Sequence, residues 1–456
     1  MKGYSLIPCG GAGSPTGANF LVKTPGLSFL VDCGLVQGSQ FAAEENGAPF
    51  PYDPATIPYL LITHAHMDHI GRIPKLVKEG FRGTIYSTPE TKELAALMLE
   101  DGANLIAREA KEAGREPIYG KEDISRAMAL WKTAGYHAPF ELSKDISIFF
   151  KDAGHILGSV IIEATLTDPN GGAPKKIAFT GDLGNSPTPL LRDTEYVADA
   201  EYMVMESVYG DRNHEPKDAR DAKLKQVLSE SLHHGGTVVI PAFSLERTQV
   251  ILYEINNLIE AKAIPQVPVF LDSPLAIKVT SVYREHIADF NEKIKAASEG
   301  GDDIFDFPGL QIVRDPAQSE AIHSMKGPKI ILAGSGMSVG GRVISHELFY
   351  IQDPNATVLL VGYQVPGSLG RRIEEKAPRL TINGQHVKVR ARIEKIGGYS
   401  SHKDSDHLVE FVSHAAPRLK RAFIAMGETR SAAFLAQRLK DELGVDAVVV
   451  EKGREY

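Results

Sequence analysis

The chain has 456 residues and a hydrophobic content of 43%, enough to bury a large core divided among two or three structural units. Asp and Glu outnumber Lys and Arg by 58 to 50, and the resulting net charge of −8 excludes a broadly basic protein that coats nucleic acid through counterion release. Two cysteines are too few for a cysteine-based zinc site, and the lack of a signal-like or membrane-spanning apolar stretch predicts a cytoplasmic location.

The first part of the chain predicts short strands and then helices. Stretches bounded by Gly or Pro predict strands at residues 4–8, 19–23, 27–32 and 59–63. Apolar residues at helical spacing predict helices at 89–113 and 122–134, before strand-like stretches return at 146–151, 160–165 and 176–180. This mixture predicts sheets with helices packed outside them.

From about Glu206 the pattern changes to repeated units of a strand followed by a helix. The predicted strands are 237–240, 269–272, 329–333 and 357–362, and the helices after them begin near 245, 275, 342 and 369. Such alternation predicts a mostly parallel sheet with helices on its faces. Beyond about Asn383, a strand at 387–396, a helix at 405–413, a strand at 422–426 and a last helix predict a return to the first unit. We therefore expect an α/β domain at 207–382 inserted into a domain formed by 1–206 and 383–456.

A compact set of potential metal ligands follows the predicted strands. His64-Ala65-His66-Met67-Asp68-His69 comes directly after one strand, and Gly154-His155 and Gly181-Asp182 follow two others. Four ligands within six residues, three of them imidazoles, form a nitrogen and oxygen set suited to zinc, and Asp182 is an acceptable bridging carboxylate. One of these histidines alone would be interpreted as an ordinary surface or core residue, whereas the joint pattern predicts a metal site.

These motifs resemble the successive ligand motifs of the metallo-β-lactamase superfamily, and Asp32-Cys33-Gly34 resembles the turn that precedes them there. Three further segments resemble motifs of the β-CASP branch, which contains ribonuclease J, the endonuclease of pre-mRNA cleavage and polyadenylation, and DNA-processing nucleases. Met205-Glu206-Ser207-Val208-Tyr209-Gly210 resembles the first acidic motif, and Ser401-His402-Lys403-Asp404 resembles the histidine motif. The segment 362–372 resembles a segment of RNA-cleaving members. The resemblance covers nearly the whole chain.

The resemblance implies a fold and a metal site. The implied fold is a metallo-β-lactamase αββα sandwich with an inserted β-CASP domain, a mostly parallel sheet flanked by helices. One zinc would be held by His64, His66 and His155, and a second by Asp68 and His69. Asp182 would bridge the two ions.

The resemblance also implies a reaction. Two cations roughly 4 Å apart lower the pKa of a bound water, and the resulting hydroxide attacks phosphorus. His402, oriented by Glu206, would protonate the leaving group as a general acid. With Asp68 and Asp182, these two residues form the implied catalytic set.

The sequence departs from the family pattern at one ligand. RNA-cleaving members carry a further zinc-binding histidine in a His-Gly-Glu string, and the matching string here is Met426-Gly427-Glu428. A thioether is a poor ligand for zinc in a nitrogen and oxygen site, so we expect Met426 to pack in the core. The second zinc should then bind more weakly, or take a water in place of the imidazole. DNA-processing members also lack that histidine, so Met426 weakens the inference of an RNA substrate, whereas the segment 362–372 favours RNA.

Two loops of the inserted domain are predicted to hold phosphates of a substrate. The segment 240–248 begins a helix directly after a strand, where backbone N–H groups can bind an anion. The glycine-rich segment 334–342 permits close approach of the backbone. Either loop alone would be an ordinary strand–helix connection. The candidate substrate contacts are Ser244, Arg247, Ser335, Gly336, Arg342 and Arg372.

The leading hypothesis is a zinc-dependent nuclease whose inserted domain clamps a single strand over the metals. Single-stranded RNA is favoured over DNA, no membrane partner is expected, and a homodimer is left open. A small-ester or thioester hydrolase of the same superfamily would need neither the inserted domain nor the Glu206 and His402 motifs. The retained ligands argue against a binding subunit with a decayed site, which only Met426 favours.

Overall fold

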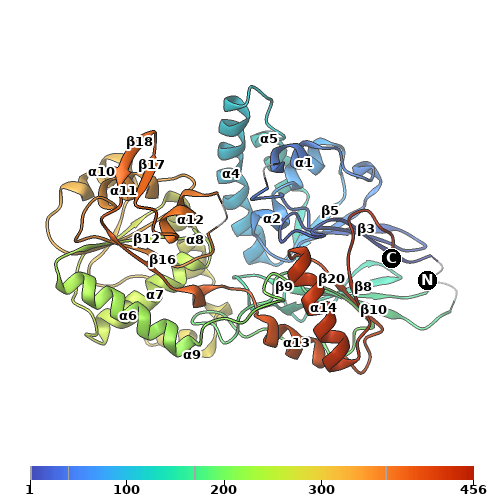
Figure 1. The fold of residues 1–456 in the computed structure, drawn as a ribbon. Helices are drawn as coiled ribbons and strands as arrows, with labels where there is room; N and C mark the ends of the chain where they lie inside the picture. Colours follow the sequence, from blue (N-terminus) through green and yellow to red (C-terminus); the bar gives the residue numbers. More distant parts are fainter. Residues whose placement is uncertain (1–2, 40, 169–170, 365–366) are drawn as a thin grey trace. The chain divides into compact units, whose positions relative to one another are not determined.

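The computed structural model describes residues 3–39, 41–168, 171–364 and 367–456, so Val365 and Pro366 of the 362–372 segment lie outside the described residues. The chain divides into two compact units (Figure 1). Unit 1 comprises Met1–Asn213 and Ser401–Tyr456, and unit 2 comprises His214–Ser400, so unit 2 is inserted between two segments of unit 1. Within the described ranges, no helix is long and apolar enough to cross a membrane.

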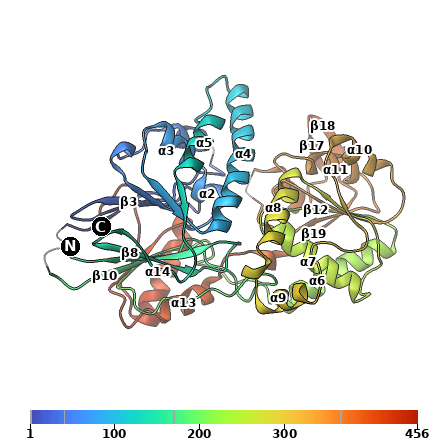
Figure 2. The same cartoon turned by 180° about the vertical axis from the view of Figure 1, so that it is seen from behind.

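The first sheet of unit 1 has six strands in the order β1-β2-β3-β4-β5-β6. β1, β2 and β3 pair antiparallel, and β3 to β6 pair parallel. Helices cover the outer face of this sheet (Figure 2). The strands are β1 (Ser5–Gly10), β2 (Asn19–Lys23), β3 (Ser28–Val31), β4 (Tyr59–Leu61), β5 (Thr84–Ser87) and β6 (Trp131–Thr133). The helices are α1 (Ala42–Gly47), α2 (Met67–Ile70), α3 (Ile73–Lys78), α4 (Pro89–Glu112) and α5 (Lys121–Ala129).

The second sheet of unit 1 has seven strands in the order β21-β20-β11-β10-β9-β8-β7. It joins the two segments of the unit, because β20 pairs parallel with β11. α13 (Ser405–Ser413) and α14 (Thr429–Leu443) pack on it through an apolar cluster that includes Leu408, Phe411 and Leu435. The strands are β7 (Phe140–Ser143), β8 (Ile146–Asp152), β9 (Val160–Leu166), β10 (Lys175–Phe179), β11 (Tyr202–Met205), β20 (Arg421–Ile424) and β21 (Ala447–Val449).

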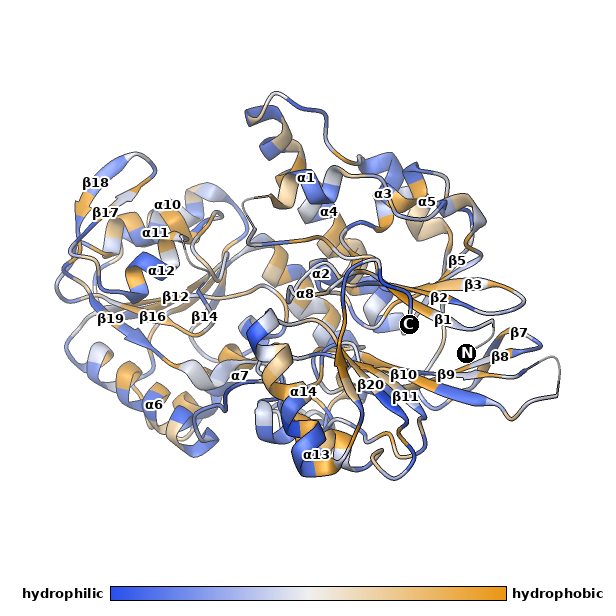
Figure 3. Ribbon diagram, turned by 45° about the vertical axis from the view of Figure 1, so that its right-hand side comes forward, coloured by the Kyte–Doolittle hydropathy of each residue, from blue (hydrophilic) through white to orange (hydrophobic). Residues whose placement is uncertain are grey.

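The two sheets pack face to face around the main core of unit 1. Along β8, Ile146, Ile148 and Phe150 are buried while the residues between them are half-buried, because successive side chains of a strand point to opposite faces. Phe20 of the first sheet and Phe179 of the second meet across the core, with ring centroids 6.3 Å apart. Apolar strands lie between the outer helices (Figure 3). Unit 1 is therefore an αββα sandwich, which confirms the predicted fold class.

Unit 2 is built on a six-stranded sheet in the order β14-β13-β15-β12-β16-β19, in which all pairings are parallel. This confirms the predicted parallel sheet. The strands are β12 (Thr237–Pro241), β13 (Val269–Asp272), β14 (Leu310–Ile312), β15 (Lys329–Ala333), β16 (Thr357–Leu360) and β19 (Arg392–Lys395), with a separate hairpin of β17 (Arg379–Ile382) and β18 (Gln385–Lys388). The helices are α6 (Lys217–His233), α7 (Arg247–Glu260), α8 (Pro274–Glu285), α9 (Glu292–Glu299), α10 (Pro316–Ser324), α11 (Val343–Tyr350) and α12 (Leu369–Glu374).

Two predicted elements differ from the structure. The strand predicted at 387–396 is divided into β18 and β19, and β19 extends the sheet of unit 2 by pairing with β16. The residues between Asn383 and Ser400 therefore belong to unit 2, and the chain returns to unit 1 at Ser401. The helix predicted at 122–134 ends at Ala129, because the buried Trp131 begins β6 and its indole N–H donates to the Ser87 hydroxyl.

Candidate metal centre

Loops from both sheets of unit 1 bring the predicted ligands together. β8, β10, β11 and β20 run in the same direction, so their carboxyl ends lie at one edge of the second sheet. His155 follows β8, Asp182 follows β10 and Glu206 follows β11. The segment 64–69 follows β4 of the first sheet and runs into the short helix α2, which ends at Ile70.

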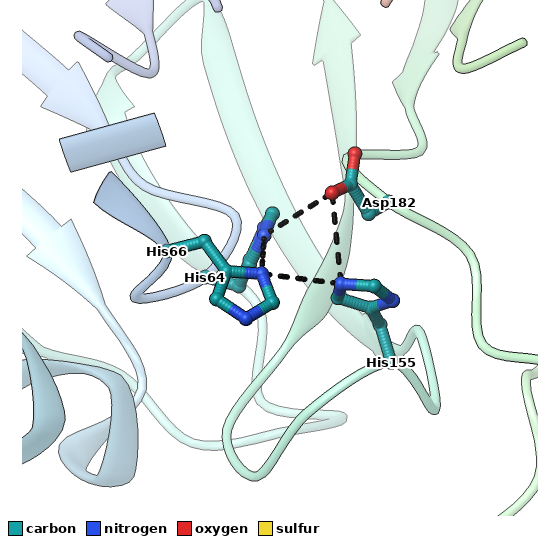
Figure 4. Close-up of side chains that lie close together, drawn as sticks. All are labelled: His64, His66, His155 and Asp182. Atoms are coloured by element: carbon teal, nitrogen blue, oxygen red, sulfur yellow. Dashed lines mark hydrogen bonds and ion pairs between the residues drawn. The ribbon is translucent and has the colours of Figure 1, made fainter. Parts of the chain in front are cut away.

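Four side-chain atoms form a first donor group, made by His64, His66, His155 and Asp182 (Figure 4). His66 Nδ1 lies 3.1 Å from His64 Nε2 and 3.2 Å from His155 Nε2. Asp182 Oδ2 lies 3.4 Å and 3.6 Å from the same two Nε2 atoms. A tetrahedral zinc ion with bonds of about 2.0–2.1 Å needs ligand atoms about 3.3–3.4 Å apart. The spacing of the first donor group thus fits zinc.

Asp182 also faces a second donor group, made with Asp68 and His69. Asp182 Oδ1 lies 3.3 Å from His69 Nε2, and Asp68 Oδ2 lies 4.0 Å from that nitrogen. His69 Nε2 and Asp182 Oδ1 are both buried, and among the described residues neither makes a hydrogen bond besides the 3.3 Å ion-pair contact between the two. Buried polar atoms with so little compensation are costly, and a cation beside them would offset that cost. The two oxygens of Asp182 therefore face two donor groups, each suited to a cation.

Asp32 orients one imidazole in each donor group. Asp32 Oδ2 lies 2.8 Å from His69 Nδ1 and accepts a 2.8 Å hydrogen bond from the Thr63 hydroxyl, whose oxygen lies 3.1 Å from His64 Nδ1. Asp32 Oδ1 accepts the backbone N–H of Thr63. The backbone φ of Asp32 is +59°, a left-handed conformation that Asp and Asn adopt more readily than most residues. Partners of this kind fix the direction of metal-binding imidazoles.

The orienting groups were missed by sequence reasoning. In the sequence Asp32 matches only a turn motif, and its position directly after a predicted strand is the signal that could have identified it as an orienting carboxylate. His155 Nδ1 lies 3.2 Å from the backbone oxygen of Ser401. Because that partner is a backbone oxygen, no side chain in the sequence could have indicated it.

Burial keeps the imidazoles of the first donor group neutral. It lowers the pKa of His64 and places the pKa values of His66 and His155 well below their usual range. Neutral imidazole is the form that binds a metal. Burial alone would raise the pKa of Asp182, but the neighbouring His69 and His64 hold it well below its usual range. The first donor group therefore combines neutral nitrogen donors with a charged carboxylate, whereas in the second group burial is outweighed by Asp182 and Asp32, which raise the pKa of His69 well above its usual range.

His402 and Glu206 form the predicted pair beside Asp182. His402 Nδ1 lies 3.2 Å from both carboxylate oxygens of Glu206, and Glu206 Oε1 also accepts the backbone N–H of Leu183 at 2.6 Å. Burial opposes protonation of His402, but the carboxylates of Glu206 and Asp182 outweigh it and raise the pKa of His402 to about 10. His402 is therefore a cation at neutral pH and can donate a proton.

Met426 follows β20 and packs into the main core of unit 1, where it is 3% exposed. Its backbone N–H donates to the Gly11 oxygen at 2.7 Å. Its side chain lines a cavity of about 10 Å³ together with His69, Glu206 and Phe20. A cavity of this size holds about one water. The residue that replaces the family histidine is thus buried next to the second donor group.

Three of the predicted substrate contacts lie on loops after the parallel strands of unit 2. Ser244 follows β12, and Ser335 and Gly336 follow β15. The Ser244 and Ser273 hydroxyl oxygens lie 3.3 Å apart. A Cβ at Gly336 would lie 2.7 Å from the Phe243 nitrogen, so only glycine fits there without a shift. These loops meet at the carboxyl edge of the sheet, where ligands of parallel α/β sheets bind.

The three predicted arginine contacts are placed differently from one another. Arg247 is 7% exposed, and its guanidinium donates to the backbone oxygen of Val361. Arg342 forms an ion pair with the buried Asp272 at 2.6 Å. Arg372 is exposed, and the one hydrogen bond described for its guanidinium is a long one of 3.4 Å to the Arg379 oxygen. The first two therefore hold loops of unit 2 together, and only Arg372 faces solvent.

Three family models match successive parts of the chain. The metallo-beta-lactamase superfamily model matches residues 16–165, and the Beta-Casp domain model matches residues 248–373. The model of the Zn-dependent metallo-hydrolase RNA specificity domain matches residues 386–450. The matches follow the chain in the order that the sequence motifs predict.

Several curated proteins are similar over most of the chain. Ribonuclease TTHA0252 of Thermus thermophilus is 35% identical over 407 residues, which cover 89% of this chain and 90% of that protein. The RNase J-like protein of Methanocaldococcus jannaschii is 31% identical, covering 95% of this chain and 94% of that protein. Transcription termination factor FttA of Methanosarcina mazei is 30% identical, covering 94% of this chain and 67% of that protein.

A solved structure shares the fold. A protein of unknown function from Enterococcus faecalis V583 superposes with a TM-score of 0.56 at 12% identity, covering 100% of this chain and 99% of that one. At this identity the likeness concerns the fold alone.

The Asp32→Asn substitution tests the orienting role of that carboxylate. Asn tolerates the left-handed backbone and keeps the shape of the side chain, so the variant should fold. It should bind zinc about 10- to 100-fold more weakly, because the amide orients His64 and His69 poorly. Competition with a chelating dye measures the affinity. Asp53→Asn removes an exposed carboxylate that also accepts a backbone N–H, and it should leave zinc affinity within about twofold. Equal zinc affinity in the two variants would contradict the role given to Asp32.

Proposed function

Since the chain belongs to the β-CASP family of the metallo-β-lactamase superfamily, we propose that it is a zinc-dependent nuclease that hydrolyses phosphodiester bonds in single-stranded RNA. The observation that carries this proposal is the pair of donor groups sharing Asp182, with the Glu206 and His402 pair beside them. Small-ester hydrolysis would require neither the inserted unit nor that pair.

RNA is the substrate that the comparisons favour. One matching family model is described as an RNA specificity domain, and the relatives of similar length carry the names ribonuclease and RNase J-like protein. Met426 favours a second candidate, a nucleic-acid-binding subunit with a weakened site. The complete first donor group favours the enzyme, because a chain that only binds RNA has no need of four ligands at zinc spacing.

The residues of the site have distinct roles in this proposal. Bound zinc would lower the pKa of a water and stabilise charge on the attacked phosphate. Asp182 belongs to both donor groups, because one of its carboxylate oxygens faces each group. Glu206 faces Nδ1 of His402, so we assign His402 Nε2 as the proton donor to the leaving oxygen. The loops carrying Ser244, Ser335 and Gly336, with Arg372, would hold the strand.

The two zinc sites would differ in affinity. Among the residues that the structure describes, the first donor group offers four ligand atoms, whereas the second has three, from Asp68, His69 and the other oxygen of Asp182. Met426 supplies no nitrogen or oxygen, although its side chain shares a cavity with His69. We therefore propose one tightly bound zinc and a second that exchanges readily.

The Met426→His substitution tests this difference. The imidazole would point into the shared cavity and give the second group a further nitrogen, so the zinc content of dialysed protein should rise from about one towards two ions per chain. Elemental analysis measures the content. Met426→Leu keeps the apolar packing and should stay near one ion. A content of two ions in the unmodified protein would show that the second site needs no further ligand.

The substrate is tested with end-labelled single-stranded RNA and DNA of the same sequence. The zinc-loaded protein should cleave RNA at least about tenfold faster than DNA, and Asp182→Ala should abolish cleavage because both donor groups lose an oxygen. Faster cleavage of DNA would support a DNA-processing nuclease instead. If the zinc-loaded unmodified protein binds RNA but cleaves neither RNA nor DNA, the result would support the binding subunit.

The His402→Ala substitution tests the proton donor. Removing a general acid should lower kcat by about 100-fold or more while zinc content stays unchanged. His407 offers a matched control, because its Nδ1 is also paired with a carboxylate, that of Asp404 at 2.6 Å, while 46% of its side chain is exposed. His407→Ala should keep kcat within about twofold. If both substitutions change kcat by a similarly small factor, His402 is not the proton donor.

A further inference from the structure

The turn that follows Glu206 carries Tyr209 and Arg212 in a fixed backbone conformation. The Arg212 N–H donates to the Tyr209 oxygen at 3.3 Å. Ser405 holds the same turn from the second segment of unit 1, because its hydroxyl donates to the Gly210 oxygen at 2.7 Å and its N–H donates to the Arg212 oxygen at 3.1 Å. The positions of both side chains are therefore tied to the backbone that also places Glu206.

Tyr209 links Arg212 to the proton donor. The Arg212 guanidinium lies over the Tyr209 ring at 4.5 Å from its centroid, and that centroid lies 6.2 Å from the centroid of the His402 ring. These two separations put the guanidinium no more than about 11 Å from His402. The side chain of Arg212 is 48% exposed, so solvent and ligands can reach it. A cation–π contact of this kind restrains a long side chain without neutralising its charge.

A second arginine adds positive charge at the same place. The Asp211 carboxylate lies 2.8 Å from Arg212 and 3.9 Å from Arg430, whose side chain is 91% exposed. Two guanidinium groups and one carboxylate give this cluster a net positive charge, in a chain whose overall charge is −8. Guanidinium groups bind phosphate oxygens in pairs with well-defined geometry. The cluster is therefore suited to a phosphate group.

We propose that Arg212, supported by Arg430, binds a backbone phosphate of the RNA strand on the side from which the leaving group departs. Tyr209 is a positioning residue that holds the guanidinium near His402. The inference rests on the function proposed above, since it takes His402 as the proton donor to the leaving oxygen. A phosphate contact carries no sequence information, so the contact should serve any RNA sequence.

The Arg212→Ala substitution is the test, with Arg454→Ala as its matched control. Arg454 also pairs with a neighbouring carboxylate, that of Glu451 at 2.6 Å, lies 5.2 Å from the centroid of the Tyr456 ring and is 57% exposed. Arg212→Ala should raise KM for single-stranded RNA about tenfold and leave kcat within about twofold. It should also make the negative slope of log affinity against log salt shallower by about 0.7, which is the contribution of one phosphate contact on a single strand. Arg454→Ala should change neither quantity.

Tyr209 gives an independent readout of the same contact. Tyr209→Ala should raise KM severalfold. Tyr209→Phe keeps the aromatic ring and should have the KM of the unmodified protein. An unchanged KM and salt slope in Arg212→Ala, in a protein whose unmodified form cleaves RNA, would overturn this inference and leave the proposed nuclease function standing. A zinc-loaded unmodified protein that neither cleaves nor binds RNA would overturn both.

Discussion

One buried carboxylate faces two donor groups, and much of unit 1 is arranged around it. Asp182 is 3% exposed, and burying an isolated carboxylate costs several kcal/mol unless cations or hydrogen-bond donors compensate for it. The residues that would hold a compensating cation together with Asp182 come from both sheets: His64 and His69 follow β4 of the first sheet, and His155 follows β8 of the second. The face-to-face packing of the two sheets is therefore needed to complete the site as well as to bury the core.

The two donor groups are alike in how they are oriented and unlike in how many ligands they offer. Asp32 reaches one imidazole in each group, directly at His69 and through the Thr63 hydroxyl at His64. The first group has four donor atoms at the spacing of a tetrahedral zinc site, whereas Met426 lies in the core beside the second group. Because Asp32 orients an imidazole in both groups, the geometry of a two-metal site would be kept. Because the second group has fewer ligands, its ion would bind more weakly.

The sequence predicted which residues of the site follow strands, but not that these strands belong to two sheets: His64 and His69 follow β4 of the first sheet, whereas His155 and Asp182 follow strands of the second. It also predicted the parallel sheet of unit 2 from the alternation of strands and helices. Features that depend on long-range pairing were not predictable. β19 joins the sheet of unit 2 only through its pairing with β16, and Trp131 begins a strand because it packs beside Ser87. Arg247 follows a strand in a phosphate-binding pattern, yet the fold buries it against the Val361 oxygen.

The central claim is that a water activated at this site attacks the phosphorus of an RNA strand. Cleavage of single-stranded RNA in ¹⁸O-labelled water by the zinc-loaded protein, followed by mass spectrometry of the products, tests it most directly. The account predicts that each cleavage in a single turnover leaves one ¹⁸O atom in the terminal phosphate of one fragment and an unlabelled hydroxyl on the other. It also predicts cleavage at a position that lacks the 2′-hydroxyl. A 2′,3′-cyclic phosphate without ¹⁸O would contradict it, because the ribose hydroxyl and not water would then be the nucleophile.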